Sequence, residues 1–202
     1  MAEVTEQKLQ RRALAHAATR TGILDAARRV AARGDARDLS LRHVAAEAGF
    51  APAALYGYFA NKDELLLALA ADDLTNLART MREAGAARSG EGRLAATAAA
   101  ALALLRVSES LAAAPGALAS TAGTSDAGRL FNGRLIAALK VLSDAAGNPA
   151  NSRDGQCDGV LVAAAVVGLA LFARSGRLEA LGFSPDEILR RLDNRFAPKA
   201  SS

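Results

Sequence analysis

The chain of 202 residues has no tryptophan, one cysteine, two histidines and two tyrosines, and aromatic side chains make up only 4% of it. The single thiol, Cys157, cannot form an internal disulfide, which suits a reducing compartment. His16 and His43 lack nearby side chains of the kinds that ligate metals, so we predict surface histidines, no metal site and no cofactor. No phosphate-binding glycine loop is present, and no nucleophile has plausible partners. These absences argue against an enzyme.

Long hydrophobic runs are scarce as well. The longest, from Val160 to Ala173, is well short of the roughly 20 residues that span a bilayer, so we predict a buried helix there. The amino-terminal stretch MAEVTEQKLQRRALAHAATR lacks the apolar segment of a secretory signal. We therefore expect a cytoplasmic protein.

Positive charge is concentrated near the amino end. Residues 1–62 contain ten Lys or Arg and six Asp or Glu, whereas residues 63–202 contain fifteen of each, so the whole net charge of +4 lies in the first part. Such an imbalance indicates a polyanionic partner, either nucleic acid or an anionic membrane surface. A basic face that is merely solvated is the alternative.

Abundant alanine and few aromatic residues favour helix over strand, and no stretch alternates as a strand does. We predict an all-α protein of about nine helices. Caps and apolar periodicity predict long helices that begin near Lys62, Arg93, Asp126, Asp158 and Pro185. The helix from Arg93 is expected to close at Pro115, and residues 147–155 are expected to form a loop.

Three shorter amphipathic segments come first, over residues 21–32, 41–48 and 52–59. Ser40 can cap the second segment, Gly49 permits a tight turn after it, and Pro52 suits the first turn of the third. Two short helices joined by such a turn have the dimensions of a helix-turn-helix, whose second helix enters the DNA major groove. An ordinary corner between two helices of a bundle is the alternative.

The run LSLRHVAAEAGFAPAALYGYFANKDELL, from Leu39 to Leu66, resembles the DNA-binding domain of the tetracycline-repressor (TetR) family of bacterial transcriptional regulators. The positions that carry the resemblance are Ile23, Ala26, Ala27, Ser40, Val44, Ala45, Gly49, Leu55, Tyr56, Phe59, Lys62 and Leu65. The resemblance implies a homodimer that binds an operator in double-stranded DNA and releases it when a small-molecule effector enters the carboxy-terminal domain.

On this basis we divide the chain into a helix-turn-helix DNA-binding domain, residues 1–62, and a helical effector-binding and dimerisation domain, residues 63–202. The predicted function is a DNA-binding transcriptional regulator, with repression as the default. A nonspecific helix-turn-helix protein that compacts DNA is the alternative.

The resemblance assigns DNA contacts residue by residue. Ser40 stands where the family usually has Thr and would hold a phosphate at a helix start. Tyr56 and Tyr58 would reach phosphates beside the groove, and Lys62 would neutralise another. Arg42 would contact a phosphate or a guanine edge, and we favour the phosphate.

The predicted recognition helix lacks most polar side chains that read bases. Relatives commonly carry Ser, Lys or Arg, Gly, Thr and His where this chain has Ala51, Pro52, Ala53, Ala54 and Gly57. We therefore expect the proline and the two alanines after it to contact thymine methyl groups, while DNA shape adds specificity. Ala51 also forgoes a side-chain cap for this helix.

Four basic residues near the amino end, Lys8, Arg11, Arg12 and Arg20, precede the motif. We expect a disordered tail here. A basic arm that adds phosphate or minor-groove contacts is the alternative.

The stretch from Gly159 to Leu192 resembles the end of the TetR ligand-binding domain, where two helices of each subunit form a four-helix dimer interface. The candidate interface residues are Ala164, Gly168, Leu171, Phe172, Ile188, Leu192 and Phe196. A place in the subunit's own core is the alternative for each. Two-fold symmetry would require a near-palindromic operator.

An effector cavity is expected among the helices of residues 63–142. The candidate lining residues are Leu104, Leu105, Ser108, Phe131 and Leu135. Plain core is again the alternative. Because no polar cluster defines the effector, we expect an apolar or weakly polar compound.

Overall fold

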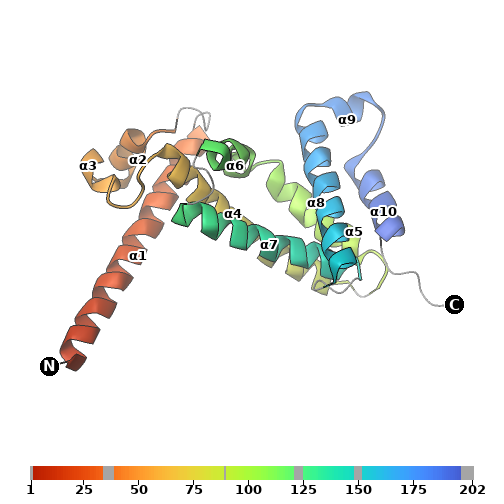
Figure 1. Cartoon of the computed structure of the whole chain (residues 1–202). Helices are drawn as coiled ribbons and strands as arrows, with labels where there is room; N and C mark the ends of the chain where they lie inside the picture. The colour runs from red at the N-terminus through yellow and green to blue at the C-terminus, as the bar shows by residue number, and fades with distance from the viewer. Residues whose placement is uncertain (1, 34–38, 89, 121–124, 148–151, 197–202) are drawn as a thin grey trace. The chain divides into compact units, whose positions relative to one another are not determined.

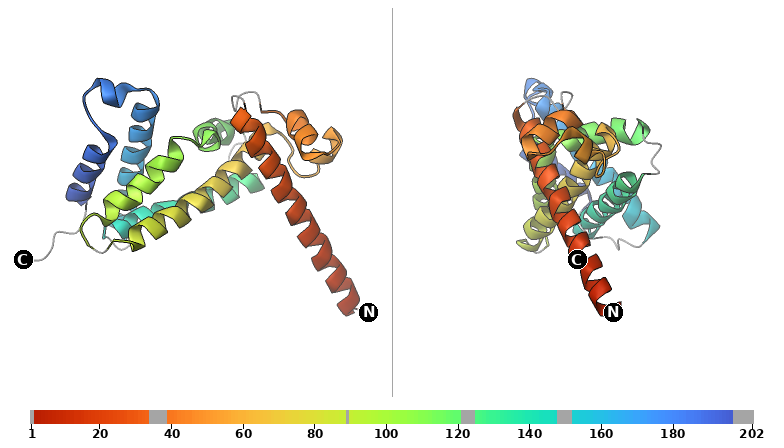
Figure 2. Two further views of the ribbon diagram at one scale, coloured as in Figure 1. Left: turned by 180° about the vertical axis from the view of Figure 1, so that it is seen from behind. Right: turned by 90° about the vertical axis from the view of Figure 1, so that its left-hand side faces the viewer.

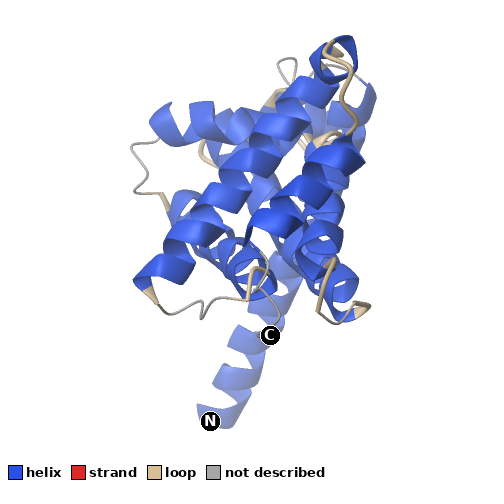
Figure 3. Ribbon diagram, turned by 90° about the vertical axis from the view of Figure 1, so that its right-hand side faces the viewer, coloured by secondary structure: helices blue, strands red, loops and turns tan. Residues whose placement is uncertain are grey.

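The computed structural model describes residues 2–33, 39–88, 90–120, 125–147 and 152–196, with side chains from residue 6 onward. Within these ranges it has ten helices and no strand (Figures 1 and 3), which confirms the predicted all-α fold. The chain forms two compact units. The first comprises residues 1–69 and 113–128, and the second comprises residues 70–112 and 129–202.

The first unit begins with α1 (Ala2–Arg33), α2 (Leu41–Ala48) and α3 (Pro52–Leu55). The hydroxyl oxygen of Ser40 accepts a hydrogen bond from the backbone N–H of His43 at 3.2 Å and so caps α2. Gly49 ends α2 at φ 74°, a conformation that only glycine adopts at little cost. The large, fully buried side chains around these helices are Ile23, Leu39, Val44, Leu55, Phe59 and Leu65. The predicted pair of short helices and its turn are therefore present.

Two expectations about the first unit are wrong. A disordered tail was expected before residue 21, but α1 is one continuous helix from Ala2 (Figures 1 and 2). Its early residues are mostly Ala, Leu, Arg, Gln and Lys, whose helix propensity is high even without a buried face. The third helix ends at Leu55 rather than near Phe59, because the carbonyl of Leu55 accepts from the N–H groups of both Tyr58 and Phe59 at 2.9 Å and closes a turn.

Helix α4 (Lys62–Ala86) begins with the predicted cap. The side-chain oxygen of Asn61 accepts from the N–H of Glu64 at 2.8 Å. The Glu64 carboxylate reaches back to the N–H of Ala60 at 2.7 Å, one residue before the position used in a standard capping box. Residues 62–69 of α4 belong to the first unit and residues 70–86 to the second.

The helix predicted from Arg93 to Pro115 is instead two helices, α5 (Arg93–Leu105) and α6 (Glu109–Ser120). The side chain of Ser108 causes the break, since its oxygen accepts from the N–H of Leu111 at 3.2 Å and caps α6. Pro115 lies inside α6 on its exposed side, where water can satisfy the carbonyl that its ring leaves without a donor.

The remaining helices are α7 (Asp126–Ala145), α8 (Arg153–Arg174), α9 (Arg177–Ala180) and α10 (Pro185–Phe196). The loop expected over residues 147–155 is wrong in its last part, because Ser152 accepts from the N–H of Gly155 at 3.0 Å and starts α8 there. Residues 148–151 lie outside the described ranges. The predicted Ser184 cap of α10 is confirmed by a 3.3 Å bond from the N–H of Glu187.

Helix α8 is more exposed than the buried helix that was expected. It packs against α5 and α9, yet only 28% of its most apolar window is buried. With 22 residues it is also long and apolar enough to cross a membrane by length and composition alone. The bent pair α5 and α6, at 78°, would pass the same test if it were one span. A core helix of a water-soluble protein passes this test too, so the finding is weak evidence for a membrane span.

Candidate nucleic-acid interface

The exposed side of α3 carries the three residues expected to touch bases. Pro52, Ala53 and Ala54 are exposed, while Leu55 is completely buried and anchors the helix to the core of the first unit. Tyr56, the next residue, exposes 62% of its surface. Because this tyrosine is not part of the core, it can contact an external partner.

The start of α2 presents the next two candidates, Ser40 and Arg42. Ser40 is half-buried, and its oxygen accepts a hydrogen bond from a backbone N–H, which leaves its O–H proton able to donate to a phosphate. Arg42 is exposed. A helix start with its unpaired N–H groups favours an anion.

Tyr58 is held against α1 rather than projecting freely. Its ring stacks on the imidazole of His16, with ring centroids 4.6 Å apart and planes inclined by 22°. One helical turn further along α1, the Arg20 guanidinium lies 5.0 Å from the centroid of the buried Phe59 ring. These two contacts fix α1 against the turn that follows α3. Sequence reasoning assigned His16 no role, because the residues that stack are distant in the chain.

Ala51 and the candidate residue Lys62 lie at the beginnings of α3 and α4. Ala51 makes no side-chain cap for α3, as expected, so the helix starts with the fixed φ of Pro52 and a 2.9 Å bond from the N–H of Ala54 to the carbonyl of Ala51. Lys62 is half-buried in the first turn of α4. All eight candidate DNA contacts thus lie in the first unit, on α2, on α3, in the turns beside them or, for Lys62, in the first turn of α4.

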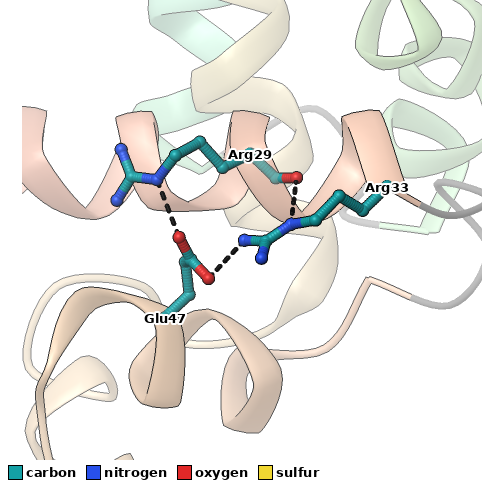
Figure 4. A network of polar contacts seen from close by, with 3 residues as sticks. All are labelled: Arg29, Arg33 and Glu47. Atoms are coloured by element: carbon teal, nitrogen blue, oxygen red, sulfur yellow. Dashed lines mark hydrogen bonds and ion pairs between the residues drawn. The ribbon is translucent and has the colours of Figure 1, made fainter.

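An ion-pair network joins α1 to α2 (Figure 4). One oxygen of the Glu47 carboxylate accepts from Arg29 Nε at 2.7 Å, and the other accepts from Arg33. Arg33 Nε also donates to the backbone carbonyl of Arg29 at 3.1 Å. Hydrogen bonds from Arg29 first and Arg33 second hold the pKa of Glu47 below its usual 4.5. The network stabilises the angle between the first two helices.

The lowered pKa of Glu47 predicts how stability depends on pH. A carboxylate with a lower pKa in the folded state stabilises that state above its unfolded pKa, and the contribution is lost as pH falls through the folded pKa. We expect Glu47→Gln to lower the free energy of unfolding at pH 7, and this difference from wild type should shrink progressively as pH falls below 4.5. Chemical denaturation over a series of pH values measures this. Glu83→Gln, which removes a more exposed ion pair with Arg79 within α4, should lower the free energy of unfolding less at pH 7.

The second unit has a cavity of about 720 Å³ between α7 and α8, but the five candidate effector residues do not line it. Its lining is formed by Ile136, Leu139, Lys140, Ser143, Arg153, Gln156, Cys157, Val160 and Leu161. Ser108, one of the five candidates, is buried and donates to the Asp73 carboxylate at 2.8 Å, so its hydroxyl serves the fold. Phe131 is also buried, while the three candidate leucines, Leu104, Leu105 and Leu135, are half-buried.

The candidate dimer residues differ between α8 and α10. On α8, Ala164, Leu171 and Phe172 are exposed and Gly168 is half-buried. On α10 the candidates, Ile188, Leu192 and Phe196, are half-buried. Other large apolar residues are also more than half exposed on α8, including Val160, Leu161 and Val167. An apolar stripe of this length is typical of a surface that is covered by a partner.

Among the residues that the structure describes, no group of three or more His, Cys, Asp or Glu side chains could hold a metal ion. The candidate DNA contacts in the first unit consist of hydroxyl, guanidinium, ammonium and apolar groups. This set can hold phosphates and contact base edges.

Helices α2 and α3 and the turn between them form a helix-turn-helix in the first unit of an all-helical chain. Residues 23–69 match the family described as "Bacterial regulatory proteins, tetR family", so this segment is the amino-terminal domain of the TetR family and the resemblance seen in the sequence is confirmed. No curated protein matches the chain in sequence.

Solved structures share the fold over most of the chain. A TetR transcriptional regulator from Rhodococcus sp. RHA1 is similar with a TM-score of 0.65 and 20% identity, covering 91% of this chain and 98% of that one. The transcriptional regulator FadR from Bacillus subtilis, solved in complex with stearoyl-CoA, is similar with a TM-score of 0.58 and 16% identity, covering 90% and 99%. A protein of unknown function from Rhodococcus sp. RHA1 is similar with a TM-score of 0.68 and 22% identity, covering 88% of this chain and 93% of that one.

Proposed function

We propose that the protein is a homodimeric transcriptional repressor that binds operator DNA through the first unit and releases it when a small molecule binds the second unit. The main observation behind the proposal is the exposed side of α3. Pro52, Ala53 and Ala54 are exposed beside the exposed Tyr56, and all four lie within the segment that matches the TetR family.

The phosphate contacts and the base contacts come from different residues. Ser40, Arg42, Tyr56, Tyr58 and Lys62 offer hydroxyl or cationic groups, which position a protein on the duplex without reading sequence. In this proposal they hold α3 in the major groove.

Base recognition then rests on Pro52, Ala53 and Ala54, which have no polar side-chain atoms. Apolar side chains can contact the C5-methyl group of thymine, and DNA shape supplies further selectivity. We expect that replacing operator thymines with uracil, which removes only that methyl group, weakens binding several-fold. Titration of thymine and uracil duplexes measures it. Equal affinity for the two duplexes would count against methyl contacts and leave the phosphate contacts unaffected.

Dimerisation is proposed to use the exposed apolar side chains of α8 between Ala164 and Phe172, outside the cavity lining, with α10 beside them. These two helices pack on each other and on α5 within the second unit (Figures 1 and 2). A two-fold dimer presents two copies of α3, so the operator should be a near-palindrome. Selection of bound duplexes from random DNA tests this. Enriched sites without two related halves would contradict a symmetric dimer on DNA.

The cavity between α7 and α8 is the proposed effector site. Ile136, Leu139, Val160 and Leu161 give it apolar walls, and Lys140 and Arg153 add positive charge. These walls suit an apolar chain with an anionic end. FadR, which shares the fold, was solved with stearoyl-CoA. An acyl compound is therefore the first effector class to examine.

Release requires that the effector bind the DNA-free arrangement more tightly than the DNA-bound one. Helix α4 contributes residues to both units, and we take it as the lever whose tilt changes the separation of the two α3 helices.

We expect stearoyl-CoA, used as a probe, to dissociate the protein–operator complex. Leu139→Trp, which fills the cavity, should require at least about tenfold more probe, while Leu130→Trp on the same helix outside the lining should behave as wild type. Fluorescence anisotropy of labelled operator measures release. Unchanged operator affinity at saturating probe would contradict this effector class.

A nonspecific DNA-compacting protein is the competing function. It would use the same basic surface and show the same steep salt dependence, because phosphate contacts dominate both. The two functions differ in selectivity between duplexes. The match of residues 23–69 to a family of regulators favours the repressor.

A further inference from the structure

The amino-terminal half of α1 projects beyond α2 and α3 in the first unit (Figures 1 and 2). Its side chains are exposed from residue 6 to residue 18, including Leu9 at 60% and Leu14 at 70%. A helix that buries nothing over this length is not needed for the core. Its surface chemistry therefore indicates what it contacts.

One row of side chains runs along this helix toward the candidate interface. Lys8, Arg12, His16 and Arg20 are each four residues apart, so they form a continuous ridge, and Arg11 lies beside it. The inner end of the row is fixed, because His16 stacks on Tyr58 and Arg20 lies over the Phe59 ring. The ridge that meets the turn after α3 therefore continues outward as a line of cations.

The charge of this row is available to a partner. Residues 6–20 contain four Lys or Arg and one acidic residue, Glu6. Among the side chains that the structure describes, no carboxylate pairs with Lys8, Arg11 or Arg12. By contrast, Arg29 and Arg33 nearer the end of α1 are both engaged by Glu47. The outer part of α1 is thus a cationic surface in a defined orientation.

We propose that residues 6–20 of α1 are a rigid basic rod that binds phosphates of duplex DNA beyond the base pairs reached by α3. The proposal rests on the DNA-binding function proposed above and extends it to a second contact surface. The helical rise of 1.5 Å per residue places Lys8 roughly 12 Å beyond His16. That length corresponds to about three to four base pairs along one strand.

Duplex DNA fits this rod better than a membrane surface does. An amphipathic helix that lies on a membrane needs its apolar residues on one face. Leu9 and Leu14 are five residues apart and lie on different sides of α1, so no continuous apolar face accompanies the cations. Regularly spaced cations without such a face suit a line of phosphates.

The test compares the full-length protein with the triple variant K8A/R11A/R12A on two duplexes, one selected from random DNA and one of arbitrary sequence. Loss of three phosphate contacts in each subunit of the proposed dimer, six in all, should lower the slope of log affinity against log salt by about 5 and weaken binding at least about a hundredfold at 0.1 M salt. The nuclease footprint should shorten by about three to four base pairs at each side.

The matched control is R82A/R88A/R106A, which removes the same charge from exposed positions in the second unit. It should leave the salt slope and footprint unchanged. The proposal would be overturned if K8A/R11A/R12A, called the arm variant below, kept the wild-type salt slope. It would also be overturned if the arm variant and the control lost the same amount of salt slope. Binding of the wild type to anionic phosphatidylserine vesicles that the arm variant loses, with DNA affinity intact, would assign the rod to membranes instead.

Variants of His16 test separately whether its stack on Tyr58 orients α1 for DNA binding. His16→Ala removes the stack on Tyr58 without removing phosphate contacts, so we expect weaker binding with an unchanged salt slope. His16→Phe keeps an aromatic ring and should restore affinity. Equal affinities of the alanine and wild-type proteins would show that the stack does not orient the rod.

The outcomes separate the two proposals. Selection from random DNA could enrich no duplex while the arm variant still shows a lower slope of log affinity against log salt on arbitrary DNA. In that case the proposed DNA contact of α1 is supported and the repressor function is contradicted. If a selected duplex binds tightly with the same slope in both proteins, only the rod fails.

Discussion

Replacing Tyr56 with Phe and Lys62 with Met in one variant is expected to weaken binding to a selected duplex at least about a hundredfold at 0.15 M salt. Loss of the lysine removes one phosphate contact from each subunit of the proposed dimer, which at this salt is worth roughly tenfold or more, and lowers the salt slope by about 1.8. Loss of the tyrosine hydroxyl removes one hydrogen bond to a charged group, worth about 1.5 kcal/mol or more. Because Tyr56 is 62% exposed, the fold should tolerate the change.

The control for this variant is Arg106→Met, which removes an exposed cation from the second unit outside the cavity lining. It should bind the duplex as wild type does. Fluorescence anisotropy titrations over a range of salt concentrations give both affinity and slope. If the double variant and the control bind equally, neither Tyr56 nor Lys62 touches DNA.

Asp193→Ala is expected to destabilise the second unit by about 3 kcal/mol, the cost of removing a buried charged acceptor from two donors. Asp193 lies on α10 and is only 4% exposed. Its two oxygens accept from the N–H groups of Gly92 at 2.9 Å and Ala95 at 3.0 Å, at the start of α5. Gly92 is the cap residue of α5 and has no side chain to satisfy these donors. The carboxylate also suits the positive end of the helix dipole.

Thermal unfolding followed by circular dichroism measures the effect, and a loss of this size corresponds to a midpoint lower by about 6 to 12 °C. Asp193→Asn keeps one oxygen acceptor and should lose roughly half as much. Asn194→Ala, at the exposed neighbouring position, should stay close to wild type. A midpoint for Asp193→Ala equal to that of Asn194→Ala would show that the long-range cap contributes nothing.

Local chemistry in the sequence was enough to locate the helix-turn-helix. Ser40, Gly49, Asn61 and Ser184 act on backbone groups within a few residues of themselves, and the structure bears out each of these caps. The apolar periodicity of α4 matches burial only in its later part, where Leu74, Leu77, Ala78 and Met81 are buried at helical spacing, whereas residues 65–71 are buried without interruption. Signals of this kind are read within one turn of helix.

Contacts between distant segments could not be predicted in the same way. Asp193 reads as an ordinary polar residue of an amphipathic helix, and its role depends on where α5 begins. The stack of His16 on Tyr58 and the pairing of Glu47 with two arginines likewise require the packing of α1 on its neighbours. Pattern alone also could not locate the cavity between α7 and α8, since it does not distinguish a packed face from a hollow one.

Helix boundaries failed where two local signals competed. Pro115 was read as the end of a helix, but the serine cap at Ser108 divides that region earlier and lets α6 run through the proline. Ser152 was read as part of a loop, although it starts α8. In both cases a serine side chain satisfied the backbone more effectively than the neighbouring glycine or proline disrupted it.

The central claim is that the exposed side of α3 selects a DNA sequence while the groups around it hold phosphates. The most direct measurement is the affinity ratio between a duplex selected from random DNA and a shuffled duplex of the same composition, at one fixed salt concentration. The account predicts a ratio of about a thousand or more for the wild-type protein. A ratio close to one would contradict it.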